Sequence, residues 1–354
     1  MREALAEWRP VVDRELERLV PREITVNAAT ELFGAPTYAY DVAAIQAAVS
    51  TPIWDLLDRG GKRWRAVLFL VLVEAFGEDP EAHLPYACVP EILHNGTIIV
   101  DDVEDDASLR RGEPALHLKY GTDVALNAGN AMYFLALDLL ARDPADLDAE
   151  TRLAAYETLL AELNRTHVGQ GMDIQWHNER KIRVTEDEYL EMCACKTGCL
   201  GRIVARLAAI VTGQPSEVEQ AVAEYAEHMS VAFQIADDVL DAEAAIEGDG
   251  GFGKAIGNDV REGKKTLMAI HAAKNASPTA AARLEEILWA EENSAAEIGE
   301  AIGILDETDS IDYARERALD LSASARERLD GLDLEPDPAD DLAAFTRFVV
   351  SRDV

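Results

Sequence analysis

Apolar residues recur every three or four positions along almost the whole of this chain of 354 residues. That spacing places them on one face of an α-helix. The pattern is clear in six segments rich in Ala, Leu, Glu and Arg, at residues 15–20, 55–76, 131–141, 151–174, 217–241 and 314–332. The alternating pattern of a β-strand is almost absent, and Gly or Pro separates the segments. We therefore predict an all-α protein built as one large helical bundle.

The sequence carries no sign of a second domain, an export signal or a membrane span. We find no internal repeat or low-complexity linker, and 48% of the residues are hydrophobic, enough for one sizeable core. Charge begins at Arg2, which argues against a secretory signal. The longest apolar run, residues 66–73, is far shorter than the roughly 20 residues that span a bilayer. We expect a single cytoplasmic domain over residues 1–354.

Five acidic residues fall within six positions, 101–106, of the segment at residues 94–117, HNGTIIVDDVEDDASLRRGEPALH. Asp101 and Asp105 are four positions apart in an apolar helical segment, so they share one face of the helix, with Asp102 beside them. Like charges at this spacing repel unless a cation lies between them. Mg²⁺ is a typical partner, because it binds carboxylates while keeping several waters and sharing oxygens with a phosphate ligand. The segment therefore predicts a carboxylate site for Mg²⁺.

A second copy of the D-D-x-x-D pattern lies in residues 233–241, FQIADDVLD, at Asp237, Asp238 and Asp241. The chain has 67 Asp and Glu against 33 Lys and Arg, so a solvated acidic face is the alternative for either cluster. Two copies inside apolar helical segments favour metal binding over that alternative. An EF-hand is excluded, because residues 101–112 lack the required glycine and terminal glutamate.

Basic residues gather in short glycine-flanked motifs and directly after the first aspartate cluster. Five of the eight lysines and several arginines lie there: Lys62, Arg63, Arg65, Arg110, Arg111, Lys196, Lys254, Lys264 and Lys265. The carboxylates of the two clusters cannot pair with all of these cations. The remaining cations indicate a ligand that carries phosphates. No P-loop or G-x-G-x-x-G motif lies at a strand-to-helix junction, so the common nucleotide sites are excluded.

Six motifs in order make the sequence resemble the trans-isoprenyl diphosphate synthases, the polyprenyl synthetase family: GGKRWR, HNGTIIVDDVEDDASLRRGEPALH, GQGMD, KTG, FQIADDVLD and GKAIGND…GKKTL. The motif-bearing core covers about residues 54–270, and the first aspartate motif and GQGMDIQW are most similar to short-chain geranylgeranyl diphosphate synthases. The resemblance implies an isoprenoid synthase fold, which is a helical bundle with a central cavity. It also implies a homodimer that condenses isopentenyl diphosphate with an allylic diphosphate.

The resemblance implies a role for each motif residue. Three Mg²⁺ ions per active site would be held on the allylic diphosphate by Asp101, Asp105 and Asp237, with Asp102, Asp238 and Asp241 in supporting positions. The allylic diphosphate would be bound by Arg110, Lys196, Thr197, Gln234, Lys254 and Lys264. Isopentenyl diphosphate would be bound by Lys62, Arg65, His94 and Arg111. Catalysis would depend most on Asp101, Asp105, Asp237, Lys196 and Lys254.

Two further expectations concern the Gly-rich segment before Lys254 and the lysine after Lys264. The Gly-rich segment at residues 247–254 should close over the metals as a lid and exclude water. Lys265 is interpreted as a surface neighbour of the ligand-facing Lys264.

Product length should depend on the apolar pocket below the first aspartate cluster. One helical turn before Asp101 lie Thr97 and Gly96, both small, where relatives that make farnesyl diphosphate place bulky aromatic residues. A growing tail would pass these positions, so we expect geranylgeranyl diphosphate (C20), with C25 or longer as the alternative. A terpene cyclase is one alternative that the sequence leaves open, although a cyclase does not need the second diphosphate site formed by GGKRWR and His94. A non-catalytic synthase subunit also stays open, although it would be expected to lose one aspartate cluster.

The charge of the chain indicates a surface adapted to high salt. The formal net charge is −34, the pI is about 4.4, and only eight of the 33 basic residues are lysines. Salt screens the self-repulsion that would destabilise so charged a compact state. No basic stripe occurs in the sequence, which argues against binding to nucleic acid or to an anionic membrane.

Three of the four cysteines lie close together, at Cys193, Cys195 and Cys199 in CACKTGC. A zinc site is the alternative, but this spacing lacks the second ligand cluster of a structural zinc site. We therefore interpret the cysteines as small buried thiols on a helix.

Overall fold

The computed structural model describes every residue except 1, 143–146, 181, 248–257, 291 and 352–354. Its described residues form helices joined by loops, with one two-stranded hairpin, so the all-α prediction is confirmed. The chain divides into two compact units. Unit 1 contains Met1–Leu159, Leu207–Gln214 and Leu334–Pro338, and unit 2 contains Leu160–Arg206, Pro215–Asp333 and Ala339–Val354. The single domain expected over residues 1–354 stays a prediction.

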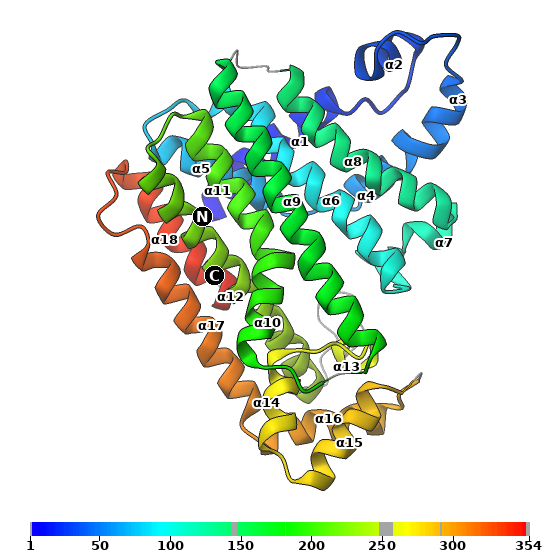
Figure 1. Cartoon of the computed structure of the whole chain (residues 1–354), viewed down its shortest axis with the longest axis vertical. Helices are drawn as coiled ribbons and strands as arrows, with labels where there is room; N and C mark the ends of the chain where they lie inside the picture. Colours follow the sequence, from blue (N-terminus) through cyan, green and yellow to red (C-terminus); the bar gives the residue numbers. More distant parts are fainter. Residues whose placement is uncertain (1, 143–146, 181, 248–257, 291, 352–354) are drawn as a thin grey trace. The chain divides into compact units, whose positions relative to one another are not determined.

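Unit 1 contains the N-terminal helices and the hairpin (Figure 1). Its helices are α1 (Arg2–Leu19), α2 (Val26–Phe33), α3 (Val42–Ile45), η1 (Gln46–Ser50), α4 (Thr51–Asp58), α5 (Trp64–Ala75), η2 (Pro80–His83), α6 (Leu84–Glu104), α7 (Leu116–Tyr120) and α8 (Thr122–Arg142). Strands β1 (Leu109–Arg110) and β2 (Glu113–Pro114) pair antiparallel, with Leu109 opposite Pro114. The hairpin lies between α6 and α7 in the chain, directly after the first aspartate cluster.

α5 is the buried helix of unit 1. Every residue from Ala66 to Val73 is at most 1% exposed, and α5 packs against α1 and α6. A helix that is apolar on all sides is stable only when it is buried on all sides. The longest apolar run of the sequence is therefore part of the hydrophobic core of this unit.

α6 and α8 lie side by side in unit 1 and approach closely at two glycines (Figure 1). A Cβ atom on Gly129 would lie 2.9 Å from Val100 Cγ2, and a Cβ atom on Gly96 would lie 2.9 Å from Met132 Cβ. Larger residues would push the two helices apart, because interiors packed this tightly do not absorb extra methyl groups. The close crossing fixes α6, which carries the first aspartate cluster at its end.

Unit 2 contains the remaining helices, and three of its helices also contribute residues to unit 1: α9, α11 and α18. The helices are α9 (Ala149–Asn178), α10 (Glu186–Cys193), η3 (Ala194–Gly198), α11 (Cys199–Val211), α12 (Ser216–Glu247), α13 (Asn258–Arg261), α14 (Leu267–Asn275), α15 (Pro278–Leu288), α16 (Ala295–Glu307), α17 (Ser310–Glu327) and α18 (Pro336–Ser351). η3 is a π-helical turn that joins α10 to α11.

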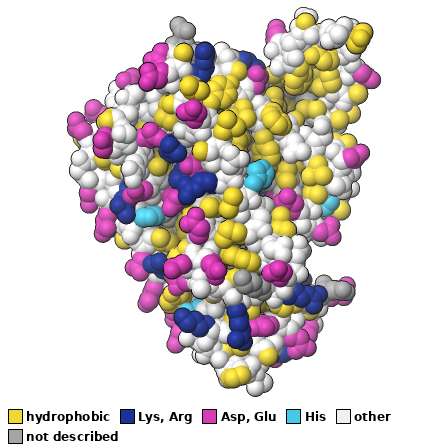
Figure 2. Space-filling view, viewed as in Figure 1, with side chains coloured by type: hydrophobic (Ala, Val, Ile, Leu, Met, Phe, Trp, Pro, Cys, Tyr) yellow, Lys and Arg dark blue, Asp and Glu magenta, His cyan; other side chains and the backbone are white. Residues whose placement is uncertain are grey.

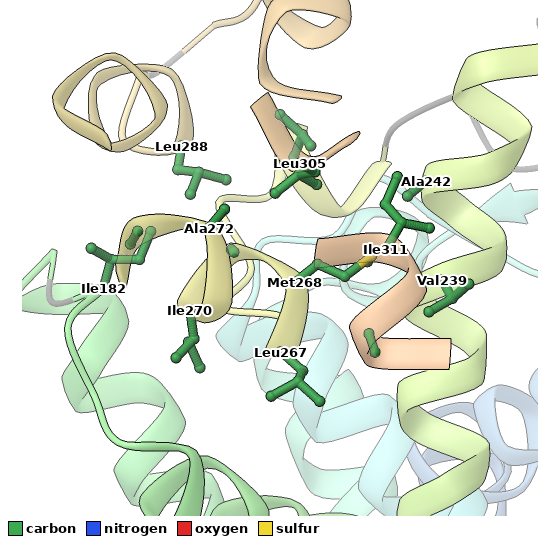
Figure 3. Packing of buried hydrophobic residues seen from close by; sticks show 14 of the residues in the cluster. Ile182, Val239, Ala242, Leu267, Met268, Ile270, Ala272, Leu288, Leu305 and Ile311 are labelled. Atoms are coloured by element: carbon green, nitrogen blue, oxygen red, sulfur yellow. The ribbon is translucent and has the colours of Figure 1, made fainter. Parts of the chain in front are cut away.

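The core of unit 2 surrounds α14 (Figure 3). Side chains from α12, α14, α15, α16 and α17 meet there, including Val239, Ala242, Leu267, Met268, Leu288, Leu305 and Ile311. α14 begins at Thr266, whose hydroxyl accepts a hydrogen bond from the Ala269 N–H at 3.2 Å. This N-cap fixes the start of the helix directly after Lys264 and Lys265.

Candidate active site

Asp101 and Asp105 lie at the C-terminal end of α6 in unit 1. Asp101 is half-buried, Asp105 is exposed, and the Asp105 N–H donates to the Asp101 carbonyl at 2.8 Å. α6 ends here because Asp106 has a left-handed conformation with φ of +50°. The C-terminal end of a helix carries partial negative charge, so two carboxylates at this end destabilise the helix. A bound cation would remove that destabilisation.

The hairpin after α6 directs Arg110 to Asp102. Arg111 and Gly112 connect its strands, and their φ angles of 54° and 80° are those of a two-residue type I′ turn. Arg110 Nε donates to Asp102 Oδ1 at 2.8 Å, and the Asp102 side chain is only 3% exposed. Burial raises the pKa of Asp102, although Arg110 opposes the shift. Asp102 is thus held by Arg110, while Asp101 and Asp105 lie nearer the solvent.

Lys62 and Arg65 lie at the N-terminal end of α5. The chain enters this helix through Gly60 and Gly61, whose φ angles of 90° and 146° are rarely adopted by other residues. The buried Glu91 carboxylate accepts from the Arg65 backbone N–H at 3.2 Å and offsets part of the positive charge. Cations at a helix N-terminus oppose the helix dipole, whereas an anion is stabilised there. This end of α5 is therefore suited to receive an anion.

His94 lies beside this group of cations in unit 1. Burial and the charges of Arg65 and Arg111 lower the pKa of His94 well below its ordinary value, so the ring is neutral at pH 7. Burial, followed by the charge of Arg63, lowers the pKa of Arg111 to about 10. Arg111 donates to Asn95 Oδ1 at 3.1 Å, a neutral acceptor that does not cancel its charge. Cations that lower each other's pKa favour the binding of an anionic group between them.

α12 carries the second aspartate cluster in unit 2. Asp237 and Asp241 are half-buried, and Asp238 is buried. Gln234 Nε2 donates to Asp238 Oδ1 at 3.0 Å, and the Tyr189 hydroxyl donates to Asp238 Oδ2 at 3.3 Å. Burial raises the pKa of Asp238 well above its ordinary value. Asp238 thus faces the interior of unit 2, and Asp237 and Asp241 lie nearer its surface.

Lys196 and Thr197 lie in the π-helical turn η3 of the same unit. Lys196 Nζ donates to Asp173 Oδ2 at 2.8 Å, and Thr197 Oγ1 donates to Gln234 Oε1 at 3.3 Å. Burial alone would raise the pKa of Asp173, but the charge and hydrogen bond of Lys196, together with the charges of Lys265 and Lys264, outweigh burial and lower the pKa. Three residues predicted to share one ligand, Lys196, Thr197 and Gln234, are therefore brought close to the second aspartate cluster.

Lys264 is connected to the second aspartate cluster through Asp259. Lys264 Nζ donates to Asp259 Oδ1 at 3.0 Å, and the Asp259 N–H donates to Asp241 Oδ2 at 3.1 Å. These groups and Asp238 line a cavity of about 20 Å³, roughly the room that one water needs. Lys254 and the Gly-rich segment predicted to be a lid lie outside the described residues.

The interpretation of Lys265 as a surface residue is wrong. Lys265 is 4% exposed, and its Nζ lies 5.1 Å from the centre of the Trp289 ring. A lysine can be buried when an aromatic face stabilises its charge. The buried Lys265 charge also helps to lower the pKa of Asp173, so its field reaches the carboxylate that pairs with Lys196.

Three site residues were missed by the reading of the sequence: Asp173, Tyr189 and Asp259. Asp173 and Asp259 belong to the motifs GQGMD and GKAIGND, but nothing in the spacing predicts their partners. Asp173 is 23 positions from Lys196, and Tyr189 is 49 positions from Asp238. Only the packing of α9, α10 and α12 brings these groups together.

The carboxylate clusters are suited to a metal ion whose coordination is completed by oxygens of the substrate. Among the residues with a described placement, no group of three or more His, Cys, Asp or Glu side chains is arranged to hold a metal ion. Mg²⁺ is usually held by one or two carboxylates, with water and phosphate oxygens as its other ligands. The accessible pair Asp101 and Asp105 is suited to that kind of site, and so are Asp237 and Asp241.

Gly96 does not leave room for a product tail in the way that its size suggested. A Cβ atom on Gly96 would lie 3.0 Å from the Gly129 carbonyl oxygen and 3.2 Å from Tyr133 Cε1, so this position faces α8. Gly96 serves the close packing of α6 on α8. Thr97 is half-buried, and its hydroxyl donates to the His94 carbonyl at 2.8 Å. The role expected of Thr97 in setting product length stays a prediction.

The cysteines are buried thiols, as predicted. All four are free and buried, and burial raises the pKa of Cys193. The Cys199 thiol donates to the Lys196 carbonyl at 3.3 Å. Cys193, Cys195 and Cys199 therefore take part in the packing of α10, η3 and α11, and Cys88 is buried in α6.

Comparisons with known proteins agree with this geometry. The family described as "Polyprenyl synthetase" matches residues 46–305. The geranylfarnesyl diphosphate synthase of Natronomonas pharaonis is 32% identical over 345 residues, which are 93% of this chain and 91% of that protein. The crystal structure of the geranylgeranyl pyrophosphate synthetase of Pyrococcus horikoshii has a TM-score of 0.85 and 29% identity, and the match covers 99% of each chain.

A further solved structure contains a metal and a substrate-like ligand. It is a polyprenyl synthase of Caulobacter crescentus, complexed with calcium and isoprenyl diphosphate. Its TM-score is 0.82 at 25% identity, and the match covers 100% of this chain and 98% of that one. The family match extends over well more than half of the chain and includes both aspartate clusters. The chain therefore belongs to the polyprenyl synthetase family of prenyltransferases.

Proposed function

We propose that this chain condenses isopentenyl diphosphate with an allylic diphosphate to give geranylgeranyl diphosphate. The placement of charge in unit 1 carries the proposal. Two accessible carboxylates lie at the negative end of α6, and a group of cations lies at the positive end of α5. Both placements oppose the helix dipole. Mg²⁺ at the first group and a diphosphate at the second would stabilise both.

In this proposal the aspartates hold metal and the basic residues divide between two diphosphates. Asp101, Asp105 and Asp237 bind three Mg²⁺ ions, with Asp102, Asp238 and Asp241 in support. The allylic diphosphate is held by Arg110, Lys196, Thr197, Gln234, Lys254 and Lys264. Isopentenyl diphosphate is held by Lys62, Arg65, His94 and Arg111. The hydrogen bond from Arg110 to Asp102 supports the placement of Arg110 on the metal side.

The charges suit a reaction that begins with loss of diphosphate. Bound Mg²⁺ would shield the negative charge that develops on the departing diphosphate. Lys196 and Arg110 would each donate hydrogen bonds to the departing diphosphate, which would lower the barrier to breaking the allylic C–O bond, whose electron pair leaves with the diphosphate. Lys62 and Arg111 hold isopentenyl diphosphate so that its double bond attacks the allylic cation and forms the new C–C bond. A proton then passes from the product cation to the released diphosphate, which restores a double bond.

The product assay tests this function directly. Purified protein is incubated in high salt and Mg²⁺ with labelled isopentenyl diphosphate and farnesyl diphosphate, and the dephosphorylated products are separated by chromatography. We expect a C20 alcohol. A C25 or longer alcohol would keep the reaction but revise the length assigned from Thr97, and the geranylfarnesyl relative makes C25 the alternative. Products formed without isopentenyl diphosphate would indicate a cyclase, and no turnover would favour a non-catalytic subunit.

We also propose that α8 forms the interface of a homodimer. Residues 124–137 of α8 contain no charged side chain, in a chain with 28% charged residues. α8 has the length and composition of a membrane span, but a core helix of a soluble protein passes the same test, and only 44% of its apolar window is buried within the chain. Phe134 is 70% exposed, and Figure 2 shows hydrophobic side chains gathered over α8. A second copy of this uncharged face would bury it without bringing two acidic surfaces together.

Phe134→Glu is expected to convert the dimer to a monomer, because two carboxylates would be buried at the interface. Light scattering in high salt gives the mass of each form. Leu319→Glu is the matched control, because Leu319 is a 49% exposed apolar residue on α17 in unit 2. A monomeric native protein, or equal masses for the native protein and both variants, would refute the assignment. Partition of the native protein into detergent would instead favour a membrane contact for α8.

We further propose that the protein is a soluble cytoplasmic enzyme adapted to high salt. The net charge of −34 and the scarcity of lysine support this. Figure 2 shows acidic side chains in many places on the face in view, with fewer basic ones. Cell fractionation would locate the protein.

A further inference from the structure

Arg202, a buried arginine of α11, supports the π-helical turn that carries Lys196 and Thr197. Arg202 is 5% exposed, and its Nη1 donates to the Ala194 carbonyl at 3.1 Å, at the start of this turn. Its Nε donates to Glu162 Oε2 at 2.8 Å, and Nη1 also donates to Glu227. Glu162 is 1% exposed. All of these residues belong to unit 2.

Other contacts hold the same turn from neighbouring helices. The Cys199 thiol donates to the Lys196 carbonyl at 3.3 Å and lies 2.8 Å from the Thr166 hydroxyl of α9. A Cβ atom on Gly169 would lie 2.5 Å from the Lys196 backbone nitrogen, so only glycine lets α9 approach the turn. Side chains therefore reach two carbonyls of the π turn, and the backbone of α9 lies directly against it.

A buried ion pair needs an explanation other than stability. Removing Arg202 and Glu162 from water costs several kcal/mol, which their attraction offsets only when the geometry is good. An apolar pair of the same size is often as stable. What an apolar pair cannot do is donate to the Ala194 carbonyl. π turns are also rare and occur mainly at functional sites, where they redirect side chains.

We propose that Arg202 is a positioning residue, which holds η3 so that the Lys196 ammonium and the Thr197 hydroxyl are aligned on one diphosphate. The inference rests on the proposed function and adds a residue that does not itself touch substrate. The planar guanidinium is required, because it reaches Glu162, Glu227 and the Ala194 carbonyl at once. A lysine keeps the charge beside Glu162 but has no such fork.

Arg202→Lys is therefore expected to raise KM for the allylic diphosphate by about tenfold, because a hydrogen bond to a charged group is worth about that factor. The KM for isopentenyl diphosphate should change by less than about twofold, since its binding residues are in unit 1. Steady-state kinetics with each substrate varied in turn measures this split. Thermal unfolding should show a folded protein, because Glu162 keeps a cationic partner.

Arg206→Lys is the matched control. Arg206 lies on the same helix and also pairs with Glu162, at 3.3 Å, but its other partner is Glu219 at 2.7 Å. None of its hydrogen bonds in the described part of the chain goes to residues of η3. This variant should change the stability of the ion-pair network while leaving both KM values near those of the native enzyme.

Any of three kinetic outcomes would overturn the inference. The first is an unchanged allylic KM in folded Arg202→Lys, the second is an equal rise of both KM values in that variant, and the third is the same rise of the allylic KM in Arg206→Lys. Mg²⁺-dependent binding of inorganic diphosphate, measured by calorimetry, provides a readout that does not need turnover. If the native protein does not turn over, the proposed function fails. Weaker diphosphate binding by Arg202→Lys than by Arg206→Lys would then still support the positioning role, and equal binding would refute it.

Discussion

Asp101→Asn lowers kcat/KM by an expected factor of about 10²–10³ and leaves the fold intact, because removal of one group that stabilises charge in a transition state has effects of this size. The amide keeps the size of the side chain but no longer binds a divalent cation strongly. Asp101 is half-buried at the end of α6, where loss of its negative charge should even stabilise the helix slightly. Activity and the Mg²⁺ concentration for half-maximal activity are measured together. Activity should fall and this Mg²⁺ concentration should rise, while the unfolding temperature stays at or above that of the native protein.

The control for this prediction is a neighbouring aspartate outside the proposed site. Asp106→Asn changes a side chain that is 98% exposed and lies 3.7 Å from His117. It removes the same charge from the same helix end, so a general electrostatic effect would appear in both variants. Equal activities for Asp101→Asn and Asp106→Asn would exclude a metal role for Asp101. Asp237→Asn in unit 2 should match Asp101→Asn if both clusters hold metal.

The sequence predicts well which helices carry the proposed metal ligands, because local periodicity decides where a helix forms. The apolar spacing around Asp101 and Asp105 sets both the helix and the face that the two carboxylates share. The same holds for Asp237 and Asp241 on α12. The run from Ala66 to Val73 predicts a core helix for the same reason, since an all-apolar helix has no face that water favours.

Contacts between distant segments could not be predicted in this way. Lys265 is adjacent to Lys264 in the sequence, but it is buried because Trp289 offers an aromatic face 24 positions later. Asp173 pairs with Lys196 because α9 lies against η3. Lysine and aspartate are usually exposed, so composition alone gives the wrong expectation for such residues.

Gly96 shows that product length is also difficult to predict from local sequence alone. A small residue one turn before Asp101 can widen a pocket or let two helices touch, and the sequence does not say which. The 2.9 Å between a Cβ atom on Gly96 and Met132 Cβ assigns it to the contact of α6 with α8. The argument for a C20 product therefore depends on Thr97 and on residues of facing helices that local spacing does not reveal.

The second large effect is unfolding of the protein at low salt. A net charge of −34 in one compact chain produces a self-repulsion that salt screens. Between about 0.1 M and about 1 M salt the Debye length falls from about 10 Å to about 3 Å, and the folded state gains on the order of 10 kcal/mol relative to the expanded chain. That gain is as large as the whole stability of an ordinary domain, about 5–15 kcal/mol. We therefore expect the protein to fold at about 1 M KCl and to unfold, at least in part, at about 0.1 M.

Circular dichroism during a KCl titration tests this expectation, with sucrose as an uncharged control that should not replace the salt. A variant with amides in place of exposed acids should fold at lower KCl, because the repulsion falls with the square of the net charge. Suitable positions are the exposed residues Glu31, Glu150, Asp187, Glu316 and Asp320. The same unfolding temperature at both salt concentrations would refute the adaptation, and recovery in sucrose would assign the effect to exclusion of solute from the surface. If KCl alone restores the fold, the acidic surface sets the salt concentration at which the helices carrying the proposed metal ligands, Asp101 and Asp237, are formed.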